Sequence, residues 1–198
     1  MQIIEEIKRF KDLNQQTPAL LWSFVYFFCL LSGYYVLRPV RDAMGASSEV
    51  EAVFPPAIIS FFAAYGIPLK ELTLQVLSTC SFALILVAQP IYGALVSRFA
   101  RRVFLPLLLG FFIICLIMFY ALFDSQIEGR GLAFFVWVTV FNVFSVAVFW
   151  SFMADVFDTE HAKLVYGYIG AGGTIGALVG PGLTRMLVGP IGVANLLL

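Results

Sequence analysis

The chain has 198 residues, of which 61% are hydrophobic, 16% aromatic and only 12% charged. Its mean hydropathy of +0.95 lies far above that of soluble domains, which excludes an ordinary soluble enzyme or binding domain. Twelve basic residues balance twelve acidic ones, so no basic field points to a nucleic-acid partner. The composition instead predicts an all-α polytopic membrane protein in contact with a lipid bilayer.

Residues 1–17 are predicted to form a cytoplasmic leader. Both signs of charge mix there, while isoleucines and a phenylalanine recur at helical spacing. The leader therefore fits either a short amphipathic helix on the membrane surface or a solvated tail. Thr17 followed by Pro18 is typical of an N-cap and a first helical turn, which predicts that the first span begins at Pro18.

Five apolar segments are long enough to cross a bilayer, which takes about 20 helical residues. A sixth run begins at Pro190 and is incomplete at Leu198. We therefore expect an N-terminal six-helix transmembrane bundle, truncated in its sixth span, whose partner is the missing C-terminal half of the same chain. The five complete spans are predicted at Pro18 to Val40, Leu72 to Val96, Val103 to Phe123, Leu132 to Val156 and Leu164 to Val188.

One long connection, residues 43–71, separates the first two predicted spans. It contains "FPPAIISFFAAYGIPL", which is too short and too interrupted by prolines to cross the membrane. We predict an interfacial or re-entrant piece in an outer loop.

The distribution of Lys and Arg predicts that the N-terminus is cytoplasmic, because basic residues gather on the cytoplasmic side of membrane proteins. With Arg38 and Arg41 set apart, more basic residues fall on the inner side than on the outer side. The inner residues are Lys8, Arg9, Lys11, Arg98, Arg101, Arg102 and Lys163, and the outer ones are Lys70, Arg130 and Arg185.

Charged residues close the first apolar run in "YYVLRPVRDAMG". On a helix Tyr34, Arg38 and Arg41 share one face, and Asp42 follows Arg38 by one turn. A guanidinium fork matches a phosphate or carboxylate with two hydrogen bonds, so we interpret this face as an anion-binding candidate. Counted from Pro18, Arg38 lies about 30 Å along the helix. Snorkelling of both arginines to the outer interface, with neutralisation of Asp42, is therefore the alternative.

The turn "GALVSRFARR" carries the second group of candidate residues. Gly93 would let another helix approach closely, and Ser97 would cap a helix end. Arg98, Arg101 and Arg102 would sit at the anionic inner leaflet and fix the topology. A simple positive-inside loop is the alternative interpretation.

The fifth predicted span carries a regular glycine spacing. Gly172, Gly176 and Gly180 recur every four residues, which gives a stripe without side chains for helix packing, and Pro181 follows to bend the helix. The pattern does not fit a nucleotide-binding glycine loop, because neither the required spacing nor a βαβ context is present.

A charged turn, "FMADVFDTEHAKLVYG", joins the fourth and fifth predicted spans. Asp155 and its charged neighbours fit either a latch of ion pairs at the inner mouth or a solvated turn. His161 in this turn is the only histidine, and the three cysteines lie inside apolar runs. We therefore expect no metal site and no cofactor.

Several of these motifs resemble a known family. The Gly93 to Arg102 turn and the glycine-spaced run ending in Gly-Pro are similar to motifs of the major facilitator superfamily. Together with "YYVLRPVRDAMG", they resemble the bacterial branch of the ATP/ADP translocases. That family's first-span motif places its nucleotide-binding basic residue on Arg41. Asn142 is the most polar residue near the position of the family's fourth-span acid.

The resemblance implies a secondary-active transporter that works by alternating access, in the inner membrane of a bacterium. Its expected substrate is a small anion, with exchange of ATP and ADP as the specific candidate. The alternatives are a proton-coupled major facilitator carrier of another substrate and a non-transporting membrane scaffold or sensor. An enzyme is not expected, because no nucleophile–base pair lies inside a predicted span.

Overall fold

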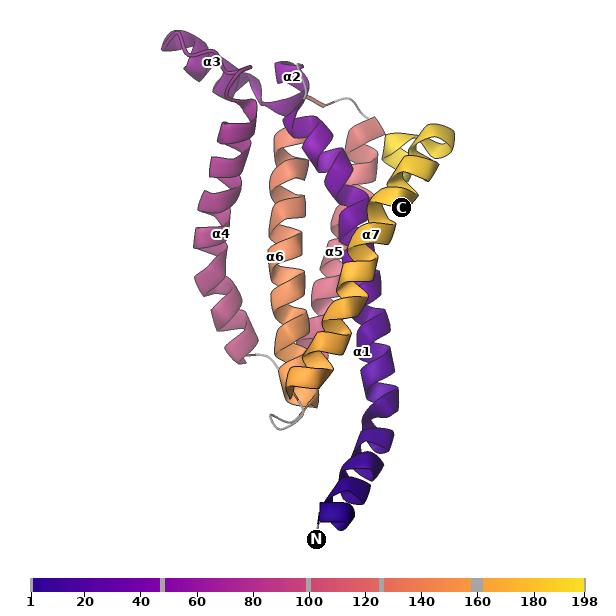
Figure 1. Ribbon diagram of the computed structural model, residues 1–198. Coiled ribbons are helices and arrows are strands. Elements are labelled where there is room, and N and C mark those ends of the chain that lie inside the picture. The colour runs from indigo at the N-terminus through magenta and orange to yellow at the C-terminus, as the bar shows by residue number, and fades with distance from the viewer. Residues whose placement is uncertain (1, 47–48, 99–100, 125–126, 158–161, 198) are drawn as a thin grey trace.

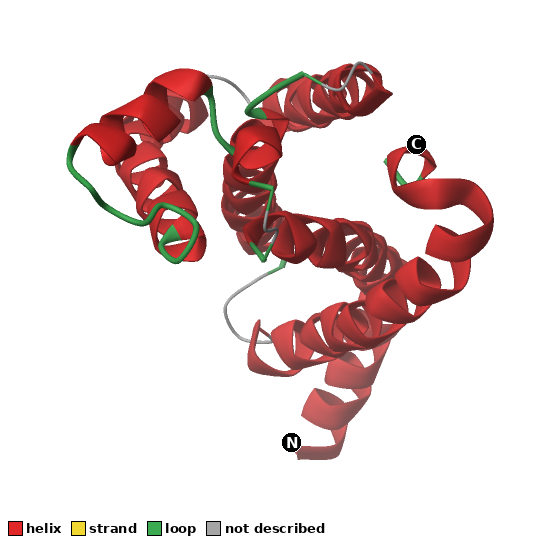
Figure 2. Ribbon diagram, turned by 90° about the horizontal axis from the view of Figure 1, so that it is seen from above, coloured by secondary structure: helices red, strands yellow, loops and turns green. Residues whose placement is uncertain are grey.

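A computed structural model describes residues 2–46, 49–98, 101–124, 127–157 and 162–197. Within these ranges every regular element is a helix, and Figure 2 shows only helices joined by loops. The predicted all-α fold class is confirmed. The elements are α1 (Gln2–Gly45), α2 (Val50–Val53), α3 (Pro56–Ala64), α4 (Thr73–Arg98), α5 (Arg101–Asp124), α6 (Arg130–Val156) and α7 (Ala162–Asn195).

Five of these helices are long and apolar enough to cross a membrane. Successive long helices run in opposite directions, so α1, α5 and α7 ascend in Figure 1 while α4 and α6 descend. The short helices α2 and α3 lie together at the upper end, where α1 ends and α4 begins. The apolar segments are Pro18–Gly45, Thr73–Val96, Pro106–Phe123, Arg130–Val156 and Val165–Val193.

The start of α1 differs from the prediction. The helix begins at Gln2 and continues through Pro18, so the expected N-cap and first turn at Thr17 and Pro18 are wrong. The leader is rich in Glu, Lys, Arg and Gln, which are good helix formers, and a proline removes only one backbone hydrogen bond. The apolar segment of α1 nevertheless begins at Pro18, inside the helix.

The end of α1 and the following loop also differ in detail. The helix ends at Gly45 and not at Val40, so Arg41 and Asp42 belong to its last turns. Within the predicted loop, α2 and α3 form short helices. Figure 1 shows α3 at the end of the bundle beside the start of α4. The interfacial or re-entrant character of this piece stays a prediction.

The last helix extends beyond the predicted fifth span. α7 continues through Pro181 and Pro190 to Asn195, and its geometry departs from helical only at Gly192, with φ 80° and ψ 166°. A positive φ of this size strains residues with a side chain but not glycine. The structure therefore places the break at Gly192, two residues beyond the Pro190 where a separate sixth run was predicted to begin.

Aromatic side chains lie in each of the three buried clusters of the bundle. Phe119 and Phe123 of α5 meet Phe134 of α6, with ring centroids 5.4 Å and 5.1 Å apart. Phe27 of α1 stacks on Phe149 of α6 at 4.4 Å. Because α6 contributes to every cluster and contacts α1, α4 and α5, it stands at the centre of the bundle.

Candidate functional site

Arg41 of α1 reaches across to α6. Its Nη1 atom donates hydrogen bonds of 3.4 Å to the hydroxyl of Tyr34 and 3.4 Å to Oγ1 of Thr139. Thr139 donates its own hydrogen to the backbone carbonyl of Phe135 at 2.8 Å, which leaves an oxygen lone pair for Arg41. The guanidinium carbon lies 5.1 Å from the ring centroid of Phe135, within cation–π range. Three side chains thus orient this guanidinium.

Asp42 connects the two arginines. Its Oδ1 atom accepts hydrogen bonds from Nη2 and Nε of Arg41 at 2.7 Å and 3.0 Å. Its Oδ2 atom lies 3.5 Å from Nε of Arg38, whose guanidinium also stands 5.4 Å from the ring of Tyr35. Two guanidiniums therefore share one carboxylate. The cluster of Tyr34, Arg38, Arg41, Asp42 and Thr139, here called the Arg41 cluster, carries one net positive charge.

Burial separates the two arginines. The side chain of Arg41 is 15% exposed, whereas those of Arg38 and Asp42 are 45% and 50% exposed. The half-exposed guanidinium of Arg38 is compatible with the snorkelling interpretation, because other side chains do not enclose it. Arg41 does not fit the snorkelling interpretation, because neighbouring side chains enclose its guanidinium group. Of the two arginines, Arg41 is therefore the stronger candidate for an anion contact.

The structure brings Tyr34, Arg41 and Asp42 together, and it adds a residue of α6 that the sequence did not indicate. The binding role of Asn142 stays a prediction. Thr139 contacts Arg41, whereas Asn142 is half-buried almost one turn further along the helix. A threonine in an apolar helix carries little signal, because its hydroxyl commonly bonds the carbonyl four residues earlier. Thr139 differs from other polar residues of α6 only in its position, which places its hydroxyl within hydrogen-bond distance of Arg41.

Arg130, at the start of α6, was also missed. From the sequence it is only an outer basic residue, yet its Nε and Nη1 atoms are buried and lack a hydrogen-bond partner in the described part of the chain. Buried donors of this kind are costly to leave unsatisfied. Because α6 begins beside the end of α1 (Figure 1), Arg130 adds a third guanidinium to the end of the bundle that carries Arg38 and Arg41.

The predicted glycine stripe lies against α1. A Cβ atom at Gly172 would fall 2.7 Å from the backbone oxygen of Phe24, and one at Gly176 would fall 2.6 Å from that of Phe28. At Gly180 the nearest atom would be Cβ of Tyr35, also at 2.6 Å. The two helices are therefore in direct backbone contact along this stripe.

Hydrogen bonds between side chains and backbone reinforce the same contact. Thr184 donates to the carbonyl of Val36 at 3.0 Å, and Ser32 donates to the carbonyl of Gly176 at 3.5 Å. Pro181, predicted to bend this helix, is exposed inside α7. The structure thus joins the helix that carries Arg41 to α7 over several turns.

The predicted turn between α4 and α5 is less fully described. Gly93 is exposed and has open space where a Cβ atom would stand, so no helix approaches it within the described ranges. Arg98 is exposed at the end of α4. The side chains of Ser97, Arg101 and Arg102 lie outside the described residues. The gating role of this turn stays a prediction.

The charged turn after α6 is also described only in part. Asp155 is exposed in the last turn of α6 and has an interaction partner. Residues 158–161, which include His161, lie outside the described residues. Among the residues that are described, no group of three or more His, Cys, Asp or Glu side chains could hold a metal ion.

Comparison with known proteins decides the family. A family model described as Major Facilitator Superfamily matches residues 67–197, which include α4 to α7. The chain belongs to the major facilitator superfamily. No curated protein and no solved structure matches it. The protein is therefore a multi-pass membrane transporter for a small-molecule substrate, and the bilayer is its environment. Because the match begins at residue 67, Arg41 lies outside it, and the comparisons assign no role to the Arg41 cluster.

Proposed function

We propose that this major facilitator protein transports an anionic solute by alternating access, and that Arg41 binds the anion. The observation that carries the proposal is the net positive charge of the Arg41 cluster. Two guanidiniums face a single carboxylate at the end of a membrane-spanning helix. Excess charge of this kind is costly in a membrane protein unless a partner neutralises it. An anionic substrate supplies that partner.

The contacts of Arg41 support a binding role over a purely structural one. Tyr34, Thr139 and the ring of Phe135 fix its guanidinium, while Asp42 is half-exposed and occupies one side of the fork. A phosphate or carboxylate that displaces Asp42 would meet a pre-oriented fork, and less conformational entropy would be lost on binding. Asp42 thus acts as a counter-ion with which the substrate competes.

Among anions, we propose adenine nucleotides as the cargo to test first, in an exchange of ATP for ADP. The support is the resemblance of "YYVLRPVRDAMG" to the first-span motif of the ATP/ADP translocases, whose nucleotide-binding basic residue maps onto Arg41. A nucleotide phosphate is a suitable ligand for a guanidinium fork, because it accepts two parallel hydrogen bonds.

Uptake into proteoliposomes tests this proposal. Vesicles filled with unlabelled ADP should accumulate labelled ATP. Arg41→Ala should weaken substrate affinity about 10- to 100-fold, since a lost charge-assisted hydrogen bond costs about 1.5–3 kcal/mol. Arg41→Lys keeps the positive charge but loses the two parallel donors of the guanidinium. Its substrate affinity should therefore lie between those of the unchanged protein and Arg41→Ala. Asp42→Asn should increase affinity, because it removes the competing carboxylate.

The controls separate binding from folding. Arg185→Ala removes an exposed arginine of α7 outside the Arg41 cluster and should leave uptake unchanged. Thr139→Val should weaken uptake less than Arg41→Ala does, because the charge of Arg41 remains and only one of the contacts that orient its guanidinium is lost. Normal uptake by Arg41→Ala would disprove the role of this residue. No exchange with any nucleotide or organic phosphate would reject the nucleotide cargo and leave the family assignment intact.

A further inference from the structure

The ring of Phe135 lies between the Arg41 cluster and a group of buried apolar side chains. Its centroid is 5.1 Å from the guanidinium carbon of Arg41, yet the residue is only 5% exposed. One ring therefore lies against both a charged group and an apolar core. The other buried members of that core are Val53, Phe54, Leu69 and Leu77.

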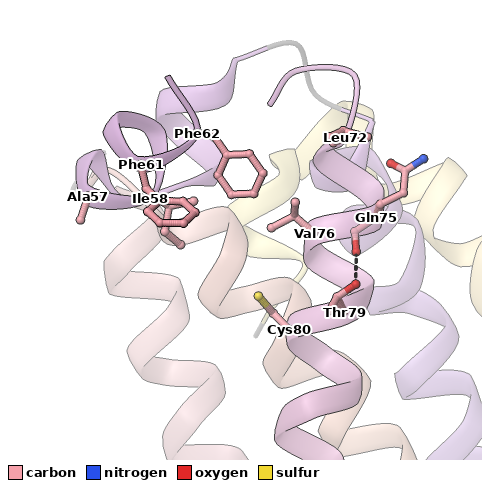
Figure 3. Close-up of a pocket in the computed structure, with 9 residues that line it drawn as sticks. All are labelled: Ala57, Ile58, Phe61, Phe62, Leu72, Gln75, Val76, Thr79 and Cys80. Atoms are coloured by element: carbon pink, nitrogen blue, oxygen red, sulfur yellow. Dashed lines mark hydrogen bonds between the residues drawn. The ribbon is translucent and has the colours of Figure 1, made fainter. Parts of the chain in front are cut away.

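These apolar side chains come from one end of the bundle. They belong to residues 50–77, which comprise α2, α3 and the start of α4 and are here called the end cap. In Figure 3 the ring of Phe62 points from α3 toward Val76 of α4, and both side chains pack on the same core. Phe135 is the buried member that α6 contributes, so it connects the end cap to the Arg41 cluster.

The backbone of α2 lies directly against the first turn of α6. A Cβ atom at Gly131 would fall 2.9 Å from Cα of Val53. The amide of Gly129 donates a 3.3 Å hydrogen bond to the carbonyl of Glu51. Gly131 precedes Phe135 by four residues, so both lie on the same face of α6. The end cap therefore holds the part of α6 that carries the ring.

The end of α1 meets the same ring at two residues one helical turn apart. The guanidinium of Arg41 stands over the ring, and a Cβ atom at Gly45 would fall 3.2 Å from Cε2 of Phe135. The same Cβ atom would fall 3.2 Å from Cδ1 of Leu74 at the start of α4. The hydroxyl of Thr139 donates to the carbonyl of Phe135 and accepts a hydrogen bond from Arg41. A displacement of Phe135 therefore disturbs both contacts of Arg41 with α6.

We infer that the end cap sets the affinity of Arg41 for its anion and that Phe135 is the positioning residue between them. This inference rests on the proposed function, in which Arg41 binds the anion. While the end cap holds the ring, the ring holds the guanidinium in one orientation, and less conformational entropy is lost when an anion binds. A rearrangement of residues 50–77 releases the guanidinium and weakens binding without any contact with the anion.

Progressive fluorination of the Phe135 ring tests its contact with Arg41. Fluorine withdraws electron density from the ring and weakens its attraction for a cation, while the shape of the side chain changes little. Mono-, di- and trifluorinated phenylalanine at position 135 should stepwise increase the rate at which phenylglyoxal modifies Arg41. The reference is Arg38, which is 45% exposed, and mass spectrometry of the purified protein measures both rates. The same series at Phe134, a fully buried ring with aromatic neighbours, should leave the ratio unchanged.

Val53→Ala tests whether the end cap acts on Arg41. It removes buried volume from the core that contains Phe135, so it should increase the modification of Arg41. It should also raise the Kd for labelled ADP about 2- to 10-fold, the equivalent of one side chain that must be immobilised on binding. Val165→Ala makes the same change at a 4% exposed position of α7 and should alter neither quantity. Gly131→Ala, which displaces α2 by overpacking, is a second variant and should act in the same direction as Val53→Ala.

The outcomes separate this inference from the proposed function. A constant modification rate across the fluorinated series would overturn the role of Phe135. Unchanged modification of Arg41, or an unchanged Kd, in the folded end-cap variants would overturn the role of the end cap. Modification needs no substrate, so changed modification in a protein that binds no nucleotide or organic phosphate would reject the proposed function and the effect on affinity, while the coupling of Arg41 to the end cap would stand.

Discussion

Replacing Gly176 by alanine tests whether α7 packs on α1 through direct backbone contact. The added methyl carbon would lie 2.6 Å from the carbonyl oxygen of Phe28 and 3.0 Å from the amide nitrogen of Ser32. Ordinary van der Waals contact begins at 3.4 Å, so the methyl group is 0.8 Å too close to the oxygen. A backbone atom inside a helix cannot rotate away as a side chain can. The two helices must therefore separate locally, in an interior that is otherwise close-packed.

Two effects with opposite signs determine how much Gly176→Ala changes the free energy of unfolding. Overpacking of this kind costs about 1–3 kcal/mol. Alanine also favours a helix by about 1 kcal/mol over glycine. Gly170→Ala, on the same helix, is the matched control, because nothing lies within 4 Å of a Cβ atom there. The gain in helix propensity is the same in both variants. Their difference, about 1–3 kcal/mol, therefore reports the overpacking alone.

Thermal unfolding of the purified protein in detergent, followed by fluorescence, measures this difference. A chain of this size loses about 2–4 °C of melting temperature for each kcal/mol, so Gly176→Ala should melt at least 2 °C below Gly170→Ala. Equal melting temperatures would refute the reasoning, because they would mean that α1 and α7 are not in contact at Gly176.

The remaining predictions concern other contacts of α1. The Thr184 hydroxyl is shared between the carbonyl of Val36 at 3.0 Å and that of Gly180 in α7 at 3.2 Å, so Thr184→Val removes both contacts and should cost about 0.5–1.5 kcal/mol by the same assay. Thr174→Val removes only a bond within α7 at an exposed position and should cost less, and the reverse order would contradict the cross-helix bond. Phe149→Ala removes a fully buried ring stacked on Phe27 and should cost about 3–5 kcal/mol. Phe111→Ala, at a 54% exposed position, should cost under half as much, and equal losses would argue against the buried stack.

The long helices could be predicted from the sequence because each has a continuous apolar run of bilayer length. The boundaries could not be predicted as well. Thr17 and Pro18 look like a helix start, but the helix-forming leader continues α1 back to Gln2. Similarly, Pro190 looks like a new start, whereas the conformational break falls at Gly192. Proline limits the local backbone without deciding where a helix ends.

The candidate site could be predicted along α1 but not across to α6. Tyr34 and Arg41 are seven residues apart, two helical turns, so their shared face follows from helical periodicity alone. Thr139 depends on the rotation of α6 about its axis, and no local pattern in an apolar helix specifies that rotation. For the same reason, the buried donors of Arg130 could not be distinguished from those of an exposed basic residue.

The glycine contact between α1 and α7 has a consequence for movement during transport. Because backbone meets backbone over Gly172, Gly176 and Gly180, the two helices cannot slide or rotate against each other without steric clash. We therefore expect α1 and α7 to move together. Any displacement of Arg41 that exposes it first to one side of the membrane and then to the other therefore carries α7 with it, whereas α4 has fewer contacts and greater freedom to change its tilt.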